Sequence, residues 1–178
     1  MLKRGRHTPA HLLLDDMPYF LTGAIYEKRR LLAQDRLKEQ LIALIEESFV
    51  RFGWTLDEWV VLDNHYHLLG RSAKGTDLPK LMARIHSQSS AFIHEATDCV
   101  LPVWWNYWDY CPRDERGYRI RQNYLFNNPL KHGYVTDLKA YRFSSFPRLL
   151  AQQGRDAAAR QFREYAEYRA LVVDEDDF

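Results

Sequence analysis

The feature that most constrains the fold is the order in which two hydrophobic patterns follow one another between residues 18 and 110. Aromatic and β-branched residues cluster, as in strands, at residues 18–27, at 54–63, from His65 to about Gly70, and at 102–110. Apolar residues recur at helical spacing over residues 31–52 and 78–95. The resulting order of strand, helix, strand, strand, helix, strand predicts a ferredoxin-like α+β sandwich, in which an antiparallel sheet carries helices on one face.

The C-terminal third is expected to be helical but less regular. A third helix is predicted from about residue 114 to 127, where Asn128-Pro129 ends it, because proline disfavours the helical conformation of the preceding residue. Residues 131–150 have the pattern of an irregular segment with short turns, and a last amphipathic helix is predicted over residues 157–172. We therefore expect a basic arm (residues 1–17), one domain (18–147) and a helical tail with an acidic end (148–178).

Charge is unevenly distributed along the chain. The 178 residues carry a net charge of only +1, which gives no overall case for nucleic-acid binding. However, Lys3, Arg4 and Arg6 open the chain, and residues 113–142 hold seven Lys or Arg against three Asp or Glu. Such a segment suits a phosphate-bearing partner, although a solvated helix face explains the charge equally well.

The sequence also bounds the compartment. Cys99 and Cys111 form neither a disulfide framework nor a zinc-type spacing, which fits a reducing cytoplasm. No apolar segment resembles a signal peptide or a membrane span. We therefore expect a soluble protein of the cytoplasm, associated with the nucleoid if it acts on DNA.

The triplet His65-Tyr66-His67 lies in a strand-like segment. Side chains alternate between the two faces of a strand, so His65 and His67 project from one face and Tyr66 from the other. Two imidazoles held in this way can bind one divalent metal ion. The alternative is a half-buried strand with two solvated histidines. His86 and His94, two turns apart on the second predicted helix, are interpreted as ordinary surface residues.

Tyr124 and Asn128 stand four residues apart on the third predicted helix and so share a face. A tyrosine hydroxyl, with a pKa of about 10, is a poor nucleophile unless a metal polarises the group it attacks. The Asn128 side-chain oxygen is a hard ligand that could join two histidines around such a metal. A packed tyrosine and a capping asparagine would give the same pattern.

Several motifs resemble one known family when they are taken in order and spacing. The segments LDNHYHLLGRS, WWNYWDY, PRDERGY and NYLFNNPLKHGYV, within residues 18–147, are similar to the single-tyrosine HUH (insertion-sequence-200-like) transposases, and more closely to the REP-associated tyrosine transposases. The resemblance implies that His65, His67 and Asn128 bind a divalent cation, Mg²⁺ or Mn²⁺, and that Tyr124 is the nucleophile. It implies a substrate of single-stranded DNA carrying a REP-like hairpin, cleaved through a 5′-phosphotyrosine intermediate.

The basic residues are candidates for contacts to the DNA backbone: Arg113, Arg116, Arg119, Arg121 and Lys131, with Lys3, Arg4 and Arg6 as a base-reading arm.

Two features depart from the family pattern. Tyr66 replaces the usual aliphatic middle residue, and Leu62-Asp63-Asn64 replaces a Met-Pro-Asn sequence, which brings Asp63 roughly into phase with His65.

Three readings of the function remain open from the sequence. An HUH relaxase or replication initiator would use the same chemistry. A non-catalytic RRM-like module would need neither the histidine pair nor Tyr124, and would use the aromatic segment 102–110 to stack bases. Both a monomer and a homodimer are compatible with the sequence.

Overall fold

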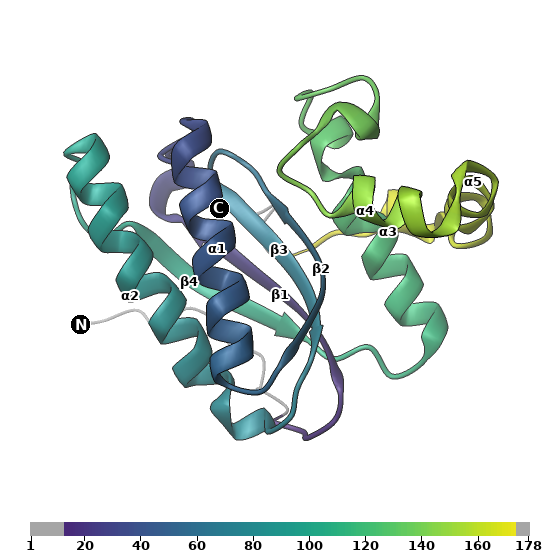
Figure 1. Cartoon of the computed structure of the whole chain (residues 1–178), viewed down its shortest axis with the longest axis horizontal. Helices are drawn as coiled ribbons and strands as arrows, with labels where there is room; N and C mark the ends of the chain where they lie inside the picture. Colours follow the sequence, from purple (N-terminus) through teal and green to yellow (C-terminus); the bar gives the residue numbers. More distant parts are fainter. Residues whose placement is uncertain (1–12, 174–178) are drawn as a thin grey trace.

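The computed structural model describes residues 13–173, and its centre is a four-stranded antiparallel sheet with strand order β2-β3-β1-β4 (Figure 1). The strands are β1 (Pro18–Ile25), β2 (Thr55–Val61), β3 (His65–Arg71) and β4 (Trp104–Tyr110). β1 pairs with β3 and β4, and β3 also pairs with β2. The predicted ferredoxin-like α+β fold is confirmed.

Two helices, α1 (Asp35–Arg51) and α2 (Leu78–Thr97), cover one face of the sheet (Figure 1). Their apolar stripes pack on the strand residues that point to this face and form the larger hydrophobic core. Tyr66, the middle residue of the histidine triplet, lies in this core and is fully buried.

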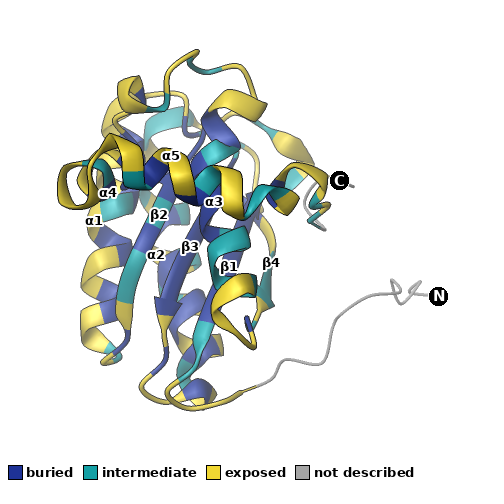
Figure 2. Ribbon diagram, turned by 90° about the vertical axis from the view of Figure 1, so that its right-hand side faces the viewer, coloured by how far each residue is buried: buried dark blue, intermediate teal, exposed yellow. Residues whose placement is uncertain are grey.

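The opposite face carries α3 (Glu115–Lys131), α4 (Phe146–Gln153) and α5 (Arg155–Glu164), as Figures 1 and 2 show together. A second core joins Phe20, Leu62 and Leu69 of the sheet side to Leu125 and Phe126 of α3. Because both faces are covered, residues 19–25 of β1 are buried without the alternation that a half-exposed strand would show. The side chains between β3 and the C-terminal half of α3 are therefore largely shielded from water.

Short 3-10 helices connect these elements at Tyr26–Lys28, Gly75–Asp77 and Leu138–Ala140, and a further one, Ala166–Ala170, follows α5. Cys99 and Cys111 are free thiols. Among the residues that the structure describes, no helix combines the length and the apolar character needed to cross a bilayer.

The prediction that Asn128-Pro129 ends the third helix was wrong, since α3 continues to Lys131 with Pro129 in its last turn. A proline there removes one N–H donor but leaves its own carbonyl and that of Asn128 available. Asn128 O accepts from His132 N at 3.0 Å, and Pro129 O from Tyr134 N at 2.8 Å. Burial of Asn128 and Pro129 against the sheet side outweighs the local preference.

The irregular segment predicted over residues 131–150 also contains more helix than expected. It includes the 3-10 helix at Leu138–Ala140 and the start of α4 at Phe146. Gly154, with φ at 81°, separates α4 from α5. The last helix, predicted over residues 157–172, ends at Glu164 and is followed by the 3-10 helix Ala166–Ala170.

Candidate active site

His65 and His67 project from β3 toward α3, with 7% and 0% of their surface exposed. Their ring centroids lie 5.1 Å apart. β3 is paired on both sides, so backbone hydrogen bonds fix the direction of both side chains. The alternation expected from the sequence holds, because Tyr66 lies in the core on the other face.

Each histidine is held through its Nδ1 atom. Thr22, the residue directly opposite His67 on β1, places its Oγ1 2.9 Å from His67 Nδ1. Asn64 Oδ1 lies 2.8 Å from His65 Nδ1. A histidine that binds a metal through one ring nitrogen ordinarily has the other held by such a partner. Nε2 is thus the nitrogen of each ring that is suited to a ligand role.

Asn128 and Tyr124 enter the same space from α3. The amide of Asn128 is 1% exposed; its Nδ2 donates to the Tyr124 carbonyl at 3.0 Å, and its Oδ1 lies 3.2 Å from His65 Nε2. Tyr124 is 3% exposed, and its ring packs edge-on against His67 at 5.4 Å and against Phe20 at 6.1 Å between centroids. The structure therefore brings the four residues predicted for metal binding and attack into one place.

The donor set fits a hard divalent cation. His65 Nδ1 faces an acceptor, so the Nδ1–H tautomer leaves a lone pair on Nε2, next to the lone pairs of Asn128 Oδ1. Two ligands at about 2.1 Å and a right angle lie roughly 3 Å apart, close to this separation. Within residues 13–173 no three His, Cys, Asp or Glu side chains form a metal-binding group, so a cation here would take two imidazoles, one amide and oxygens from outside the protein.

The protonation state of His67 also suits metal binding. Burial, followed by the charge of the neighbouring His65, lowers the pKa of His67 well below its usual value. His67 is therefore a neutral imidazole at pH 7, and the neutral form is the one that binds metal.

Sequence reasoning missed some residues of this site. His132, just after α3, packs edge-on against His65 with ring centroids 5.1 Å apart. Thr22 is 45 positions from His67 in the chain, and no sequence pattern links the two. Lys131 was predicted to contact DNA, yet its Nζ lies 3.2 Å from Tyr124 Oη. The one available signal was helical spacing. His132 lies four residues after Asn128, and Lys131 lies seven residues after Tyr124.

Asp63 is paired with two basic side chains, which keep its carboxylate from acting as a metal ligand. Its Oδ1 lies 2.8 Å from Lys38 Nζ, and its Oδ2 lies 2.5 Å from the Arg30 guanidinium. Burial acts to raise the pKa of the Asp63 carboxyl, but the hydrogen bonds and charges of Lys38 and Arg30 outweigh it and lower the pKa below its usual value. The carboxylate thus anchors the turn between β2 and β3, just before His65.

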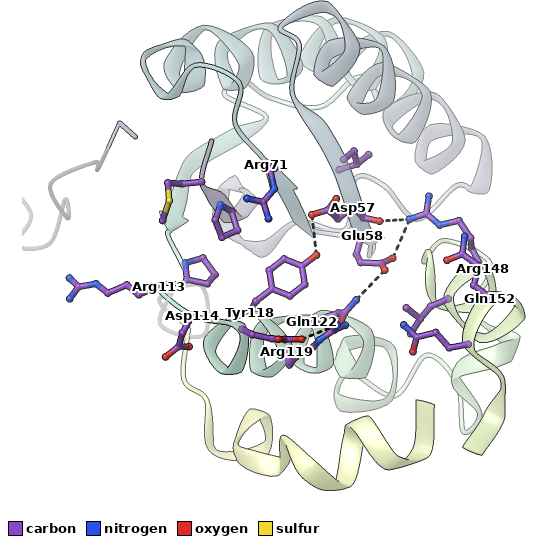
Figure 3. A pocket seen from close by; sticks show the side chains of 17 residues that line it. Asp57, Glu58, Arg71, Arg113, Asp114, Tyr118, Arg119, Gln122, Arg148 and Gln152 are labelled. Carbon is purple, nitrogen blue, oxygen red and sulfur yellow. Dashed lines mark hydrogen bonds and ion pairs between the residues drawn. The ribbon is translucent and has the colours of Figure 1, made fainter. Parts of the chain in front are cut away.

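Arg113 and Arg119 line a polar pocket of about 710 Å³ beside the N-terminal half of α3 (Figure 3). None of the residues predicted for metal binding or attack lines it. The remaining predicted DNA contacts are placed elsewhere: Arg116 pairs with Glu167, and Arg121 lies over the Tyr110 ring, 4.0 Å from its centroid. Lys3, Arg4 and Arg6 lie outside the described residues.

The pocket wall shows what fixes α3 against the sheet (Figure 3). Glu58 of β2 is 7% exposed and accepts hydrogen bonds from Gln122 at 3.1 Å, Ser145 at 2.6 Å and Arg148 at 3.2 Å. Burial raises the pKa of Glu58, partly opposed by these donors. One carboxyl thereby ties α3 and the start of α4 to the strand beside β3.

His86, interpreted as an ordinary surface residue, is half-buried, whereas His94 is exposed as expected. His86 Nε2 lies 2.8 Å from the Tyr66 hydroxyl, and its ring stacks on Trp104 with centroids 4.6 Å apart. Burial lowers the pKa of His86 to about 3. The neutral ring therefore anchors Tyr66 from the far face of the sheet.

Comparisons with known proteins place the chain among transposases. The family described as "Transposase IS200 like" matches residues 20–111. A REP-associated tyrosine transposase of Escherichia coli (strain K12) is 30% identical over 99 residues, which cover 54% of this chain and only 57% of that relative. A putative REP-associated tyrosine transposase of Haemophilus influenzae is 25% identical over 153 residues, covering 72% of this chain and 83% of the relative.

A solved structure of a REP-associated tyrosine transposase bound to a REP hairpin has the same fold. Its TM-score is 0.68 at 23% identity, over 83% of this chain and 86% of that one. The family match includes the histidine pair and ends before Tyr124 and Asn128. Because the family model matches more than half of the chain, the chain belongs to the IS200-like transposase family.

Proposed function

We propose that this protein is a metal-dependent transposase and endonuclease that cleaves and rejoins single-stranded DNA beside hairpins through a 5′-phosphotyrosine intermediate. The observation that carries the proposal is the convergence of Tyr124 with His65, His67 and Asn128 between β3 and α3. Two elements that are far apart in sequence supply a hydroxyl nucleophile and a set of metal ligands to one buried place.

The cation, Mg²⁺ or Mn²⁺, would be held by His65, His67 and Asn128, and when bound it withdraws charge from the phosphate oxygens. Thr22 and Asn64 keep the imidazoles oriented, and the Asn128 amide is fixed by its bond to the Tyr124 carbonyl. Because these hydrogen bonds already hold the side chains in place, little conformational entropy is lost when the substrate binds.

In cleavage, Tyr124 Oη attacks a phosphodiester in line with the departing 3′ oxygen. A bond forms between Oη and phosphorus, and the bond from phosphorus to the 3′ oxygen breaks. The phenolic proton is lost and a proton is gained by the 3′ oxygen, which leaves a 5′-phosphotyrosine and a free 3′-hydroxyl. Attack by another 3′-hydroxyl reverses the step and joins DNA without an external energy source.

The proposed substrate is a single strand carrying a REP-like hairpin, in line with the REP hairpin bound by the structural relative. We propose that residues 18–147 form the catalytic unit, residues 1–17 an arm that reads bases beside the hairpin, and residues 148–178 a tail. Such a protein would act in the cytoplasm, where the chromosome lies, as a monomer or a homodimer.

The decisive experiment is Tyr124→Phe, which removes one oxygen and leaves the ring packing nearly unchanged. The parent protein, with Mn²⁺ and an end-labelled hairpin oligonucleotide, should form an adduct that survives denaturant, and EDTA should prevent it. Tyr124→Phe should bind metal and DNA as the parent does and form no adduct.

Tyr118→Phe is the matched control, because Tyr118 also lies on α3 and donates its hydroxyl to Asp57 at 3.0 Å, in the polar pocket. This variant should form the adduct. An adduct in Tyr124→Phe, or one mapped by mass spectrometry to Tyr118 or Tyr134, would overturn the assignment. Equal cleavage of strands with and without a hairpin would favour a relaxase-like or initiator-like nickase.

A further inference from the structure

The last turn of α3 carries a cation directly over the proposed nucleophile. Lys131 stands seven residues after Tyr124, close to two full helical turns, so both side chains lie on nearly the same line along the helix. Lys131 Nζ is 3.2 Å from Tyr124 Oη and 5.0 Å from the centre of its ring. The lysine is exposed, whereas the tyrosine is buried.

Other basic side chains of α3 are directed elsewhere. Arg116 pairs with Glu167, and Arg119 lies 3.3 Å from Glu115. Lys131 is directed at Tyr124 Oη, the protein atom that forms and breaks a bond to phosphorus in the proposed reaction. A lysine ammonium is a compact point charge with three donors, so it can contact the tyrosine oxygen and an incoming phosphate oxygen together.

We propose that Lys131 is a catalytic residue whose ammonium donates a hydrogen bond to Tyr124 Oη and stabilises the negative charge that this oxygen carries in cleavage and in joining. The inference rests on the proposed function, in which Tyr124 is the nucleophile.

A hydrogen-bond donor at Tyr124 Oη would assist both cleavage and joining. In cleavage the phenol loses its proton as the bond from Oη to phosphorus forms. In joining, the incoming 3′-hydroxyl attacks, the bond between phosphorus and Oη breaks, and the electron pair leaves with the tyrosine oxygen. A phenol has a pKa of about 10, so the departing phenolate is unstable at neutral pH without help. A donor already in place around such an oxygen lowers the barrier.

This role differs measurably from a backbone contact to DNA. Removing a lysine that only neutralises a phosphate lowers DNA affinity and the salt dependence of binding, and leaves the rate at saturating DNA unchanged. Removing a lysine that acts on Oη lowers the rate at saturating DNA and leaves affinity nearly unchanged.

The test uses the full-length protein with Mn²⁺ and a single-stranded hairpin oligonucleotide. Lys131→Met keeps the apolar stem over the Tyr124 ring and removes the donor, while Lys131→Arg keeps charge and donors. Lys139→Met is the control, because it removes one exposed positive charge that pairs with Asp137. We expect Lys131→Met to lower single-turnover cleavage and joining about 100-fold, the loss typical of removing one oxyanion donor, with DNA affinity changed less than about threefold.

We expect Lys131→Arg to recover a large part of the rate, and Lys139→Met to behave like the parent. Placing 3,5-difluorotyrosine at position 124, whose phenolate is intrinsically more stable, should restore joining in Lys131→Met more than it changes joining in the parent. Parental rates in Lys131→Met, or a loss confined to affinity, would overturn the inference and leave the proposed function intact. An adduct that persists in Tyr124→Phe, measured alongside, would remove the proposed function instead.

Discussion

Single residues decide which nitrogen of each histidine faces the site. Thr22 and Asn64 each hold an Nδ1 atom, and both are neutral side chains that contribute direction and no charge. Metal affinity at a site of two imidazoles and one amide should depend strongly on such orientation, because within residues 13–173 no carboxylate joins the two histidines as a further ligand.

Thr22→Val tests this dependence. The substitution keeps the shape of a fully buried side chain and removes the hydroxyl that holds His67. We expect Mn²⁺ affinity to fall 10- to 100-fold, a range typical for the loss of an outer partner of a metal-binding histidine. Titration calorimetry in the absence of DNA measures this directly, with His67→Ala as the reference for complete loss. Parental affinity in Thr22→Val would show that the hydroxyl does not orient the ring.

At the scale of elements, the contact between β1 and β3 depends on a missing side chain. Gly23 lies opposite Tyr66, and a Cβ built at Gly23 would be 2.4 Å from Tyr66 Cζ. The Tyr66 side chain cannot move aside freely, because its hydroxyl is hydrogen-bonded to His86 and its ring packs against Trp104. The bulky middle residue of the triplet therefore depends on the absence of a side chain on the neighbouring strand.

Gly23→Ala should consequently destabilise the protein by about 1–3 kcal/mol, the usual cost of overpacking a core. Combining it with Tyr66→Val, which restores an aliphatic residue, should cost less than the sum of the two single changes by about 1 kcal/mol or more. Urea unfolding followed by circular dichroism gives the free energies. Additive effects would show that the two positions do not compete for the same space.

The sequence was most informative about elements whose pattern is local. The order of strands and helices followed from periodicity, and strand alternation placed His65 and His67 on one face. The end of α3 was predicted wrongly, because Pro129 is a local signal that burial against the sheet overrides. The contacts of Asp63 with Lys38, and of Thr22 with His67, join residues 25 or more positions apart on different elements. Local patterns carry no information about such pairs.

At the scale of the whole molecule, the site lies between the sheet and the helices that cover one of its two faces. One core holds α1 and α2 against the sheet, and the other holds α3 to α5 on its opposite face. Tyr124, at 3% exposure, lies inside the second layer. In the proposed reaction a phosphate must therefore come close to the sheet side of α3, and a flexible single strand can do this more readily than a duplex of fixed width.

We expect cleavage of single strands carrying a hairpin to exceed cleavage of the same sequence in a fully paired duplex by at least about 100-fold, which corresponds to roughly 2.7 kcal/mol. Binding should also weaken as salt rises, with a slope of about −0.7 per phosphate contacted on a single strand. Gel-shift and cleavage assays over a salt series measure both. Equal rates on the two substrates would contradict a site restricted to single strands.

The division of the site between the sheet and one helix has a consequence for insertions and deletions. The position of α3 is set by its own contacts, such as Gln122 with Glu58 and Asn128 with His65, and not by the length of the loop at residues 111–114. A residue added to that loop should leave the site assembled. A residue added between Tyr124 and Asn128 turns one of them about 100° away from the other and shifts it about 1.5 Å along the axis. Chains that keep this chemistry should therefore tolerate length changes before α3 and none within that single turn.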